Sequence, residues 1–161
     1  VLRVLGTKAA FCTLLIDVFK GFIAVSIAQG KFNNLGAMLA FAAVVIGHIY
    51  PIVFKFRGGK GVATFFGTMA ALSLHLFLVL ILCTVVIAVI IKSLTIGFYS
   101  SLPLITFLNY VETRSFIILI IFILIVSLVS VVGVKDIEQA FEKYFRTPVK
   151  KRPTVKKKPA R

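Results

Sequence analysis

Long apolar segments separated by short polar ones constrain the fold of this chain more than any other feature. Apolar runs cover about residues 9–28, 35–54, 95–110 and 115–132, and residues 62–91 are apolar almost throughout. The mean hydropathy of +1.06 is far above that of a soluble domain of 161 residues. In lipid only helices and closed barrels satisfy the backbone, and continuous rather than alternating hydropathy selects helices. The sequence therefore predicts an all-α, polytopic membrane protein.

The apolar stretch 62–91 is too long for one simple crossing. As a single helix it would measure about 45 Å, against a hydrocarbon core of roughly 30 Å. We predict a break near Ser73–His75, which gives a short helix at 62–73 and a longer one at 75–91, and about six crossings in all. The alternative is one strongly tilted span, which would place the C-terminal tail on the opposite side of the membrane.

The charge distribution favours a membrane protein over a nucleic-acid-binding one. The formal net charge is +14, and ten of the nineteen Lys and Arg residues lie beyond residue 134. Cations that gather in a tail and at the ends of apolar runs are typical of cytoplasmic segments that attract anionic lipids. We predict a membrane-embedded domain over 1–133 and a basic cytoplasmic tail over 134–161. Within the tail, Ile137, Phe141, Tyr144 and Phe145 have the spacing of a helix lying on the membrane.

A glycine-rich segment, "KFRGGKG" at residues 55–61, interrupts the apolar sequence and is called the glycine loop here. Gly58, Gly59 and Gly61 allow close approach of the backbone to a ligand, and the helix expected after the loop offers unpaired N–H groups. With Lys60 and Arg57 this composition suits a phosphate. The spacing is not that of a Walker A loop, which disfavours ATP hydrolysis. The alternative is an ordinary flexible turn that carries positive charge on the cytoplasmic side.

A few polar residues within or beside the apolar runs are further candidates. Asp17 and Lys20, spaced i,i+3, share a helix face and form either a structural ion pair or part of a site. His48, near the end of its run, could bind phosphate, transfer a proton or be structural. Ser93 is either a phosphate donor or, more simply, a helix N-cap. Neither cysteine has a spacing that indicates metal or redox chemistry.

The segment "GHIYPIVFKFRGGKGVAT", residues 47–64, closely resembles the second signature of the bacterial acyl-phosphate:glycerol-3-phosphate acyltransferases. That signature reads G-H-x-x-P-x-F-x-x-F-x-G-G-K-G-V-A-T. The matching residues are Gly47, His48, Pro51, Phe56, Gly58, Gly59, Lys60, Gly61, Val62, Ala63 and Thr64, whereas Val53 replaces a usual Phe.

The resemblance extends over about residues 1–132. "VLRVLG" resembles the end of the first signature, with Arg3 as its arginine, and "DVFKG" resembles the helix that follows. Residues 92–94 are similar to a short Ser-Leu element. The remaining first-signature residues fall before residue 1, and an ungapped reading places Gly133 and Asp136 where the third signature normally has His and Asn. The family has seven membrane helices with a cytoplasmic-side site, so six here plus one upstream would agree.

The resemblance implies a bacterial inner-membrane enzyme that transfers a fatty acyl group from acyl phosphate to the 1-hydroxyl of glycerol 3-phosphate, giving lysophosphatidic acid for phospholipid synthesis. Acyl phosphate is already activated, so neither metal nor nucleotide cofactor is expected. The implied catalytic residues are His48, Lys60 and Arg3, the phosphate-binding residues are Gly58, Gly59, Lys60, Gly61, Arg57 and Ser93, and the supporting residues are Asp17, Lys20 and Thr64. The alternatives are a membrane carrier or channel for a phosphorylated solute, and an inactive remnant of the enzyme.

Overall fold

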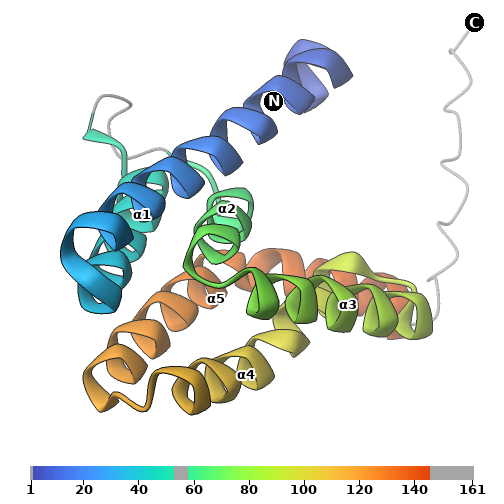
Figure 1. Cartoon of the computed structure of the whole chain (residues 1–161). Coiled ribbons are helices and arrows are strands. Elements are labelled where there is room, and N and C mark those ends of the chain that lie inside the picture. Colours follow the sequence, from blue (N-terminus) through green and yellow to red (C-terminus); the bar gives the residue numbers. More distant parts are fainter. Residues whose placement is uncertain (1, 53–57, 146–161) are drawn as a thin grey trace, which may run out of the picture.

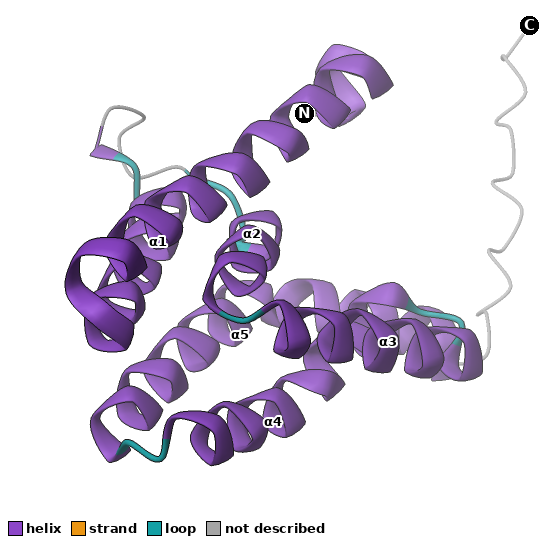
Figure 2. Cartoon of the chain, viewed as in Figure 1, coloured by secondary structure: helices purple, strands orange, loops and turns teal. Residues whose placement is uncertain are grey.

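The computed structural model describes residues 2–52 and 58–145, except for the side chains of residues 2–7, 9–10 and 144–145. Within these residues all regular secondary structure is helical, which confirms the all-α prediction (Figure 2). The helices are α1 (Leu2–Ile49), α2 (Val62–Leu72), α3 (Leu74–Ile91), α4 (Leu94–Thr113) and α5 (Phe116–Phe145).

Helix α1 folds back on itself, so its two halves lie side by side (Figure 1). Lys20 Nζ lies 2.7 Å from His48 Nδ1, whereas 28 residues of straight helix would separate them by about 42 Å. The reversal centres on Asn33, whose φ of 62° is left-handed. The Asn33 side chain accepts a hydrogen bond from the Leu35 N–H at 3.1 Å, which supports the bend. The first arm of α1, before Asn33, contains the predicted run 9–28, and the second arm, which ends at Ile49, contains the predicted run 35–54 up to that residue.

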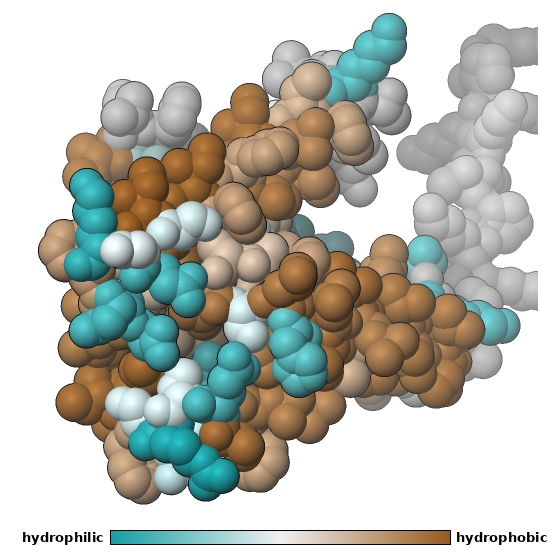
Figure 3. Space-filling view, in the orientation of Figure 1, coloured by the Kyte–Doolittle hydropathy of each residue, from teal (hydrophilic) through white to brown (hydrophobic). Residues whose placement is uncertain are grey.

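Four helices of the described chain are long and apolar enough to cross a membrane, namely Phe11–Ile49, Leu74–Ile91, Leu94–Thr113 and Phe116–Lys143. The first has 39 residues and would measure about 58 Å as a straight helix. Because it bends at Asn33, this length is shared between its two arms. Helix α2, with 11 residues, reaches only about 16 Å. Together with the two arms of α1, the helices form six apolar rods, and much of their outer surface is hydrophobic (Figure 3).

The break predicted near Ser73 is present. Ser73 has an extended backbone between α2 and α3, and its side chain accepts a hydrogen bond from the Leu76 N–H. Ser93 occupies the equivalent place between α3 and α4 and accepts from the Ile96 N–H at 3.4 Å. The N-cap interpretation of Ser93 is therefore confirmed.

Helix α5 runs without interruption through the predicted boundary at 133/134 and ends at Phe145. Gly133 lies inside this helix, tightly packed against the Tyr99 ring of α4. The segment that contains Ile137 and Phe141 is helical as predicted, but it continues the last apolar helix instead of forming a separate one. The later part of the predicted tail, residues 146–161, lies outside the described residues.

A cluster of buried aromatic rings joins four of the helical rods. Phe65 of α2 contacts Phe41 of the second arm at a centroid separation of 5.1 Å, and Phe98 of α4 at 5.8 Å. Phe122 of α5 completes the cluster by edge-on contact with Phe41. Such edge-to-face pairs add to the packing energy of large apolar side chains. The cluster fixes the start of α2, and hence the adjoining glycine loop, relative to α1 and α5.

Candidate active site

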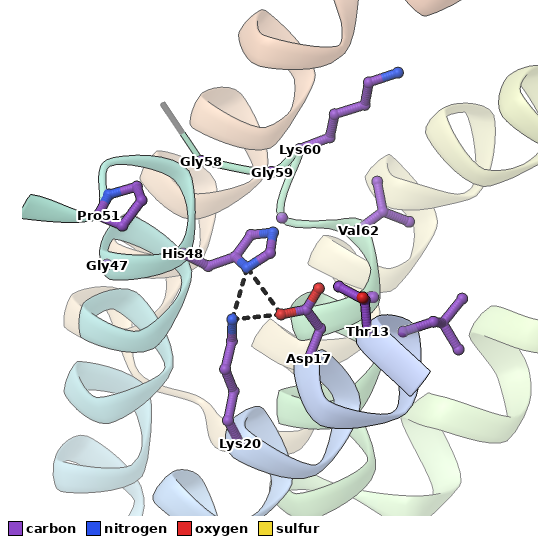
Figure 4. Close-up of a pocket in the computed structure, with 13 residues that line it drawn as sticks. Thr13, Asp17, Lys20, Gly47, His48, Pro51, Gly58, Gly59, Lys60 and Val62 are labelled. Atoms are coloured by element: carbon purple, nitrogen blue, oxygen red, sulfur yellow. Dashed lines mark hydrogen bonds and ion pairs between the residues drawn. The ribbon is translucent and has the colours of Figure 1, made fainter. Parts of the chain in front are cut away.

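A pocket of about 630 Å³ opens where the two arms of α1 meet the glycine loop and the first turn of α2 (Figure 4). The first arm contributes Thr13, Leu14, Asp17 and Lys20, the second arm and the residue after it contribute Gly47, His48 and Pro51, and the loop and α2 contribute Gly58, Gly59, Lys60, Gly61, Val62 and Ala63. Most of the site residues predicted from sequence therefore converge in one place. The fold-back of α1 is what brings its first arm to the loop.

Asp17, Lys20 and His48 form a compact polar triad in this pocket (Figure 4). Lys20 Nζ donates to Asp17 Oδ1 at 2.6 Å and lies 2.7 Å from His48 Nδ1, and Asp17 Oδ1 lies 3.2 Å from the same nitrogen. The Asp17 and His48 side chains are only 16% and 12% exposed. The ion-pair interpretation of Asp17 and Lys20 is thus confirmed, and both residues line the pocket, whereas their part in a site stays a prediction.

The triad leaves the other edge of the His48 ring facing the glycine loop. When Lys20 donates to Nδ1, the proton of a neutral imidazole lies on Nε2. Nε2 becomes an acceptor only when Nδ1 carries the proton and donates it to Asp17, which requires Lys20 to withdraw from its 2.7 Å contact with Nδ1. A Cβ added at Gly59 would collide with Nε2 and its neighbouring ring atoms. The Nε2 edge of the His48 ring therefore lies against Gly59 inside the pocket.

The glycines of the loop are required for close packing against the second arm. A Cβ at Gly58 would collide with the backbone carbonyls of His48 and Ile49. Gly61 has φ 81° and begins α2 without a side-chain cap. The Gly59 N–H donates to the His48 carbonyl at 3.2 Å. The Gly59 amide is therefore engaged by a backbone carbonyl, so at this glycine the N–H is not available to a ligand in the observed arrangement.

The side chain of Lys60 extends away from His48 (Figure 4). Its ammonium forms an ion pair with the Asp136 carboxylate of α5. The Lys60 side chain is 58% exposed and that of Asp136 26% exposed, so the pair lies at the rim of the pocket. Lys60, predicted from the sequence to bind phosphate, is thus engaged by a carboxylate in this structure. The sequence placed Asp136 at the third signature but did not predict this contact, because it joins residues 76 positions apart.

The charges of the described pocket are nearly balanced. The two lysines that line it, Lys20 and Lys60, are each paired with a carboxylate, from Asp17 and Asp136. An anionic ligand must therefore compete with these carboxylates or rearrange them. Among the described residues no cluster of three or more His, Cys, Asp or Glu side chains could hold a metal ion.

The remaining predicted site residues lie elsewhere or cannot be placed. Ser93 is a buried cap between α3 and α4 and does not line the pocket. Thr64 is fully buried in α2, and its hydroxyl has no partner within the described chain. Arg3 belongs to α1, but its side chain is not described, and Arg57 lies outside the described residues. Thr13 also lines the pocket and was not predicted, although it lies one helical turn before Asp17, a spacing that could have revealed it.

Comparison with known proteins places this geometry in a family. The family model described as "Glycerol-3-phosphate acyltransferase" matches residues 1–143. A glycerol-3-phosphate acyltransferase of Thermoanaerobacter sp. (strain X514) is 42% identical over 115 residues, which cover 71% of this chain and 58% of that protein. One from Coxiella burnetii (strain CbuG_Q212) is 47% identical over 93 residues, covering 56% of this chain and 48% of that protein. The matched part of the chain thus spans about half the length of these curated relatives.

Solved structures show the same likeness in three dimensions. The crystal structure of PlsY (YgiH), described as an integral membrane glycerol 3-phosphate acyltransferase in its glycerol 3-phosphate form, superposes with a TM-score of 0.79 at 27% identity. The superposition covers 89% of this chain and 72% of that one. A second PlsY structure, the lysophosphatidic acid form, gives a TM-score of 0.78. The chain belongs to the glycerol-3-phosphate acyltransferase family.

Proposed function

We propose that this chain transfers a fatty acyl group from acyl phosphate to the 1-hydroxyl of glycerol 3-phosphate, giving lysophosphatidic acid. The observation that carries this proposal is the convergence of the Asp17–Lys20–His48 triad and the glycine loop in one pocket of a family member. The similar PlsY structures, in glycerol 3-phosphate and lysophosphatidic acid forms, support the acceptor and the product. The acyl-phosphate donor is the finer part of the proposal and rests on the sequence signature.

His48 acts as the proton acceptor in the proposed reaction. The hydroxyl oxygen of glycerol 3-phosphate attacks the acyl carbonyl, a carbon–oxygen ester bond forms, and the carbon–oxygen bond to phosphate breaks. The hydroxyl proton passes to Nε2 of His48, and phosphate leaves with the electron pair. For Nε2 to accept this proton, Nδ1 must already carry one and donate it to Asp17 at 3.2 Å, so the step requires Lys20 to withdraw from its 2.7 Å contact with Nδ1. Asp17 then holds the ring orientation and stabilises the imidazolium. A phosphate oxygen of the substrate is the alternative acceptor.

The pocket contributes most through positioning, because the donor is already activated. Lys60, Gly58 and Gly61 bind substrate phosphate in this proposal, and Arg3 and Arg57 are assigned the same role on the signature match. Lys60 must leave Asp136 to do so, which an exposed ion pair permits at a cost of about 1 kcal/mol or less. Holding the hydroxyl and the carbonyl in contact replaces a bimolecular encounter, an effect that provides a large share of a rate enhancement.

The membrane supplies the acyl chain and sets the orientation. The apolar pocket residues Leu14 and Val62 lie beside the triad, so an acyl chain can reach the carbonyl position from between the helices. The proposal places the pocket and the basic C-terminal segment on the cytoplasmic side of the bacterial inner membrane, where cationic segments gather. Anionic lipids are the partners proposed for that segment.

The test is acyl transfer by the full chain in liposomes, with acyl phosphate and glycerol 3-phosphate supplied and lysophosphatidic acid measured by mass spectrometry. We expect product from the unmodified chain and a large loss in Lys60→Ala. Equal activity in Lys60→Ala would remove the loop from the site. Phosphate flux without acylation would favour a carrier. A folded chain that gives no flux and no product would favour an inactive remnant.

A further inference from the structure

A second pocket lies at the opposite end of the second arm and of α2, where three connections meet. It is called the bend pocket here and is formed by the bend of α1, the α2–α3 link and the end of α4. Its polar lining residues are Gln29, Asn34, Ser73, Asn109, Glu112 and Thr113. Helix α2 separates it from the glycine loop by about 16 Å. Figure 3 shows hydrophilic residues gathered near this end of an otherwise apolar face.

Asn109 is the most informative residue of the bend pocket. Its side chain is on a helix of the membrane domain, is 1% exposed and lines the pocket. Its Oδ1 has no hydrogen-bond partner within the described chain. Leaving a buried amide oxygen without a partner is destabilising, so a cation that this oxygen coordinates would stabilise the fold.

Glu112 supplies the formal charge of the bend pocket. The chain has only five Asp and Glu residues among nineteen Lys and Arg, and two of the five, Asp17 and Asp136, are in ion pairs. Among the described residues Glu112 pairs with no cation, and it accepts a hydrogen bond only from the Ser73 hydroxyl at 3.1 Å. No Lys or Arg lines the pocket. A carboxylate in such a basic chain is therefore available to a cation from solution.

The donor set selects a class of ligand. The polar side chains around the pocket offer carboxylate, amide and hydroxyl oxygens and no imidazole or thiol, a set that suits hard cations. A single carboxylate balances one positive charge, whereas sites for divalent ions usually include more acidic ligands. The pocket holds about 100 Å³, against roughly 30 Å³ for one water. That volume admits an ion with one or two waters but not a lipid headgroup.

We propose that the bend pocket binds a monovalent inorganic cation, sodium or potassium, through Glu112 and the Asn109 amide oxygen. The ion would join the bend of α1, the α2–α3 link and the end of α4, and would stabilise the fold at the end away from the active-site pocket. This role is independent of acyl transfer.

Thermal unfolding of the full chain in detergent tests the site, followed by circular dichroism in sodium, potassium or choline chloride at equal ionic strength. We expect sodium or potassium to raise Tm by about 2–4 °C over choline in a saturable manner. Glu112→Gln should abolish that rise. The matched control Glu138→Gln, which removes an exposed carboxylate of α5, should keep it.

Two results would overturn the proposal. Equal Tm in all three salts would mean that water fills the pocket, and stabilisation by magnesium or calcium alone would exclude a monovalent site. If Glu112→Gln does not fold, sodium NMR on the unmodified chain decides. Saturable line broadening that potassium competes away supports the site, and its absence refutes it.

Discussion

Two helix pairs in this molecule pack by the same device but differ in polar content. In the first pair, Gly67 of α2 contacts the backbone of the first arm at Val18. In the second, Gly97 of α4 contacts the α3 backbone at Thr84. Small residues let membrane helices approach this closely, and the resulting contact area drives association in lipid. Close packing in this chain therefore needs glycine and does not need charge.

The polar groups of the two pairs show the difference. Between α3 and α4 the buried polar contact is neutral: Ser101 donates to the Phe98 carbonyl at 2.7 Å, and its oxygen meets the Thr84 hydroxyl at 3.1 Å. The first arm instead carries Asp17 and Lys20. Charges inside membrane helices are costly, and the α3–α4 pair shows that this fold can close without them. The charges of the first arm, which contact His48 of the second arm, are therefore not required for helix packing, and the proposed function gives them a role.

The largest expected effect is loss of activity when the triad is broken. We expect His48→Gln to lower the rate of acyl transfer by about 100-fold or more, because a positioned proton acceptor contributes about 10²–10⁴-fold. The matched control is His75→Gln, which removes an exposed histidine of α3 outside the pocket and should retain full activity. Initial rates in liposomes provide the measurement. An active His48→Gln enzyme would transfer the proton-acceptor role to substrate phosphate.

Gly67→Ala tests the packing side of the comparison. A Cβ at this position would overlap the Val18 backbone, which has little freedom to move. We expect the variant to lose about 1–3 kcal/mol of unfolding free energy, the usual cost of overpacking. Gly97→Ala should show a loss of similar size, because its Cβ would meet the Thr84 carbonyl.

The control for both glycine variants is Gly30→Ala, since a Cβ at Gly30 has open space around it. Better helix propensity should leave this variant unchanged or more stable by up to about 1 kcal/mol. Denaturant-induced unfolding in mixed micelles, followed by circular dichroism, measures all three. Equal losses at Gly30 and Gly67 would show that close approach of the helices is not what these glycines provide.

Local patterns predicted much of the fold. Helix lengths follow from the apolar runs and the bilayer thickness, which also placed the break near Ser73. The cap at Ser93 was predicted because serine can hydrogen-bond the start of the helix that follows it. The continuity of α5 was missed because its amphipathic end changes composition without changing backbone conformation. A change from apolar to charged composition marks a change of surroundings, from lipid to water. It does not mark the end of a helix, because a single helix can cross that boundary.

The sequence predicted which residues line the site better than it predicted how they contact one another. The signature and helix spacing identified His48 and Asp17, but the Lys60–Asp136 pair and the hydrogen bond from the Gly59 amide depend on how distant segments meet. Such contacts are decided by the packing of whole helices, and no local pattern encodes them. For the same reason Thr64, inside the signature, is a buried residue of α2 rather than a pocket residue.

Asp136→Asn tests whether the rim pair restrains Lys60. The ion pair at the rim holds Lys60 by about 0.2–1 kcal/mol. Without it, glycerol 3-phosphate should bind about 1.4- to 5-fold more tightly, which isothermal titration calorimetry measures. The gain should shrink at high salt, because exposed charges are screened. Glu138→Asn, which removes a nearby exposed carboxylate of α5, is the control and should change affinity less. Weaker binding in Asp136→Asn would instead assign Asp136 a part in orienting Lys60 toward the ligand.

The smallest effect is expected from the neutral contact between α3 and α4. The Ser101 hydroxyl donates its hydrogen to the Phe98 carbonyl, so in the contact between the two hydroxyls Thr84 donates and Ser101 accepts. Hydrogen bonds between membrane helices average about 0.6 kcal/mol, and Thr84→Val should cost about that much with acyl transfer unchanged. A double-mutant cycle with Ser101→Ala isolates the contact from the packing of the added methyl group. A coupling energy well above about 2 kcal/mol would contradict this prediction, and so would a loss of activity in Thr84→Val. Either result would make the neutral contact as important as the triad, and the two helix pairs would no longer differ as described.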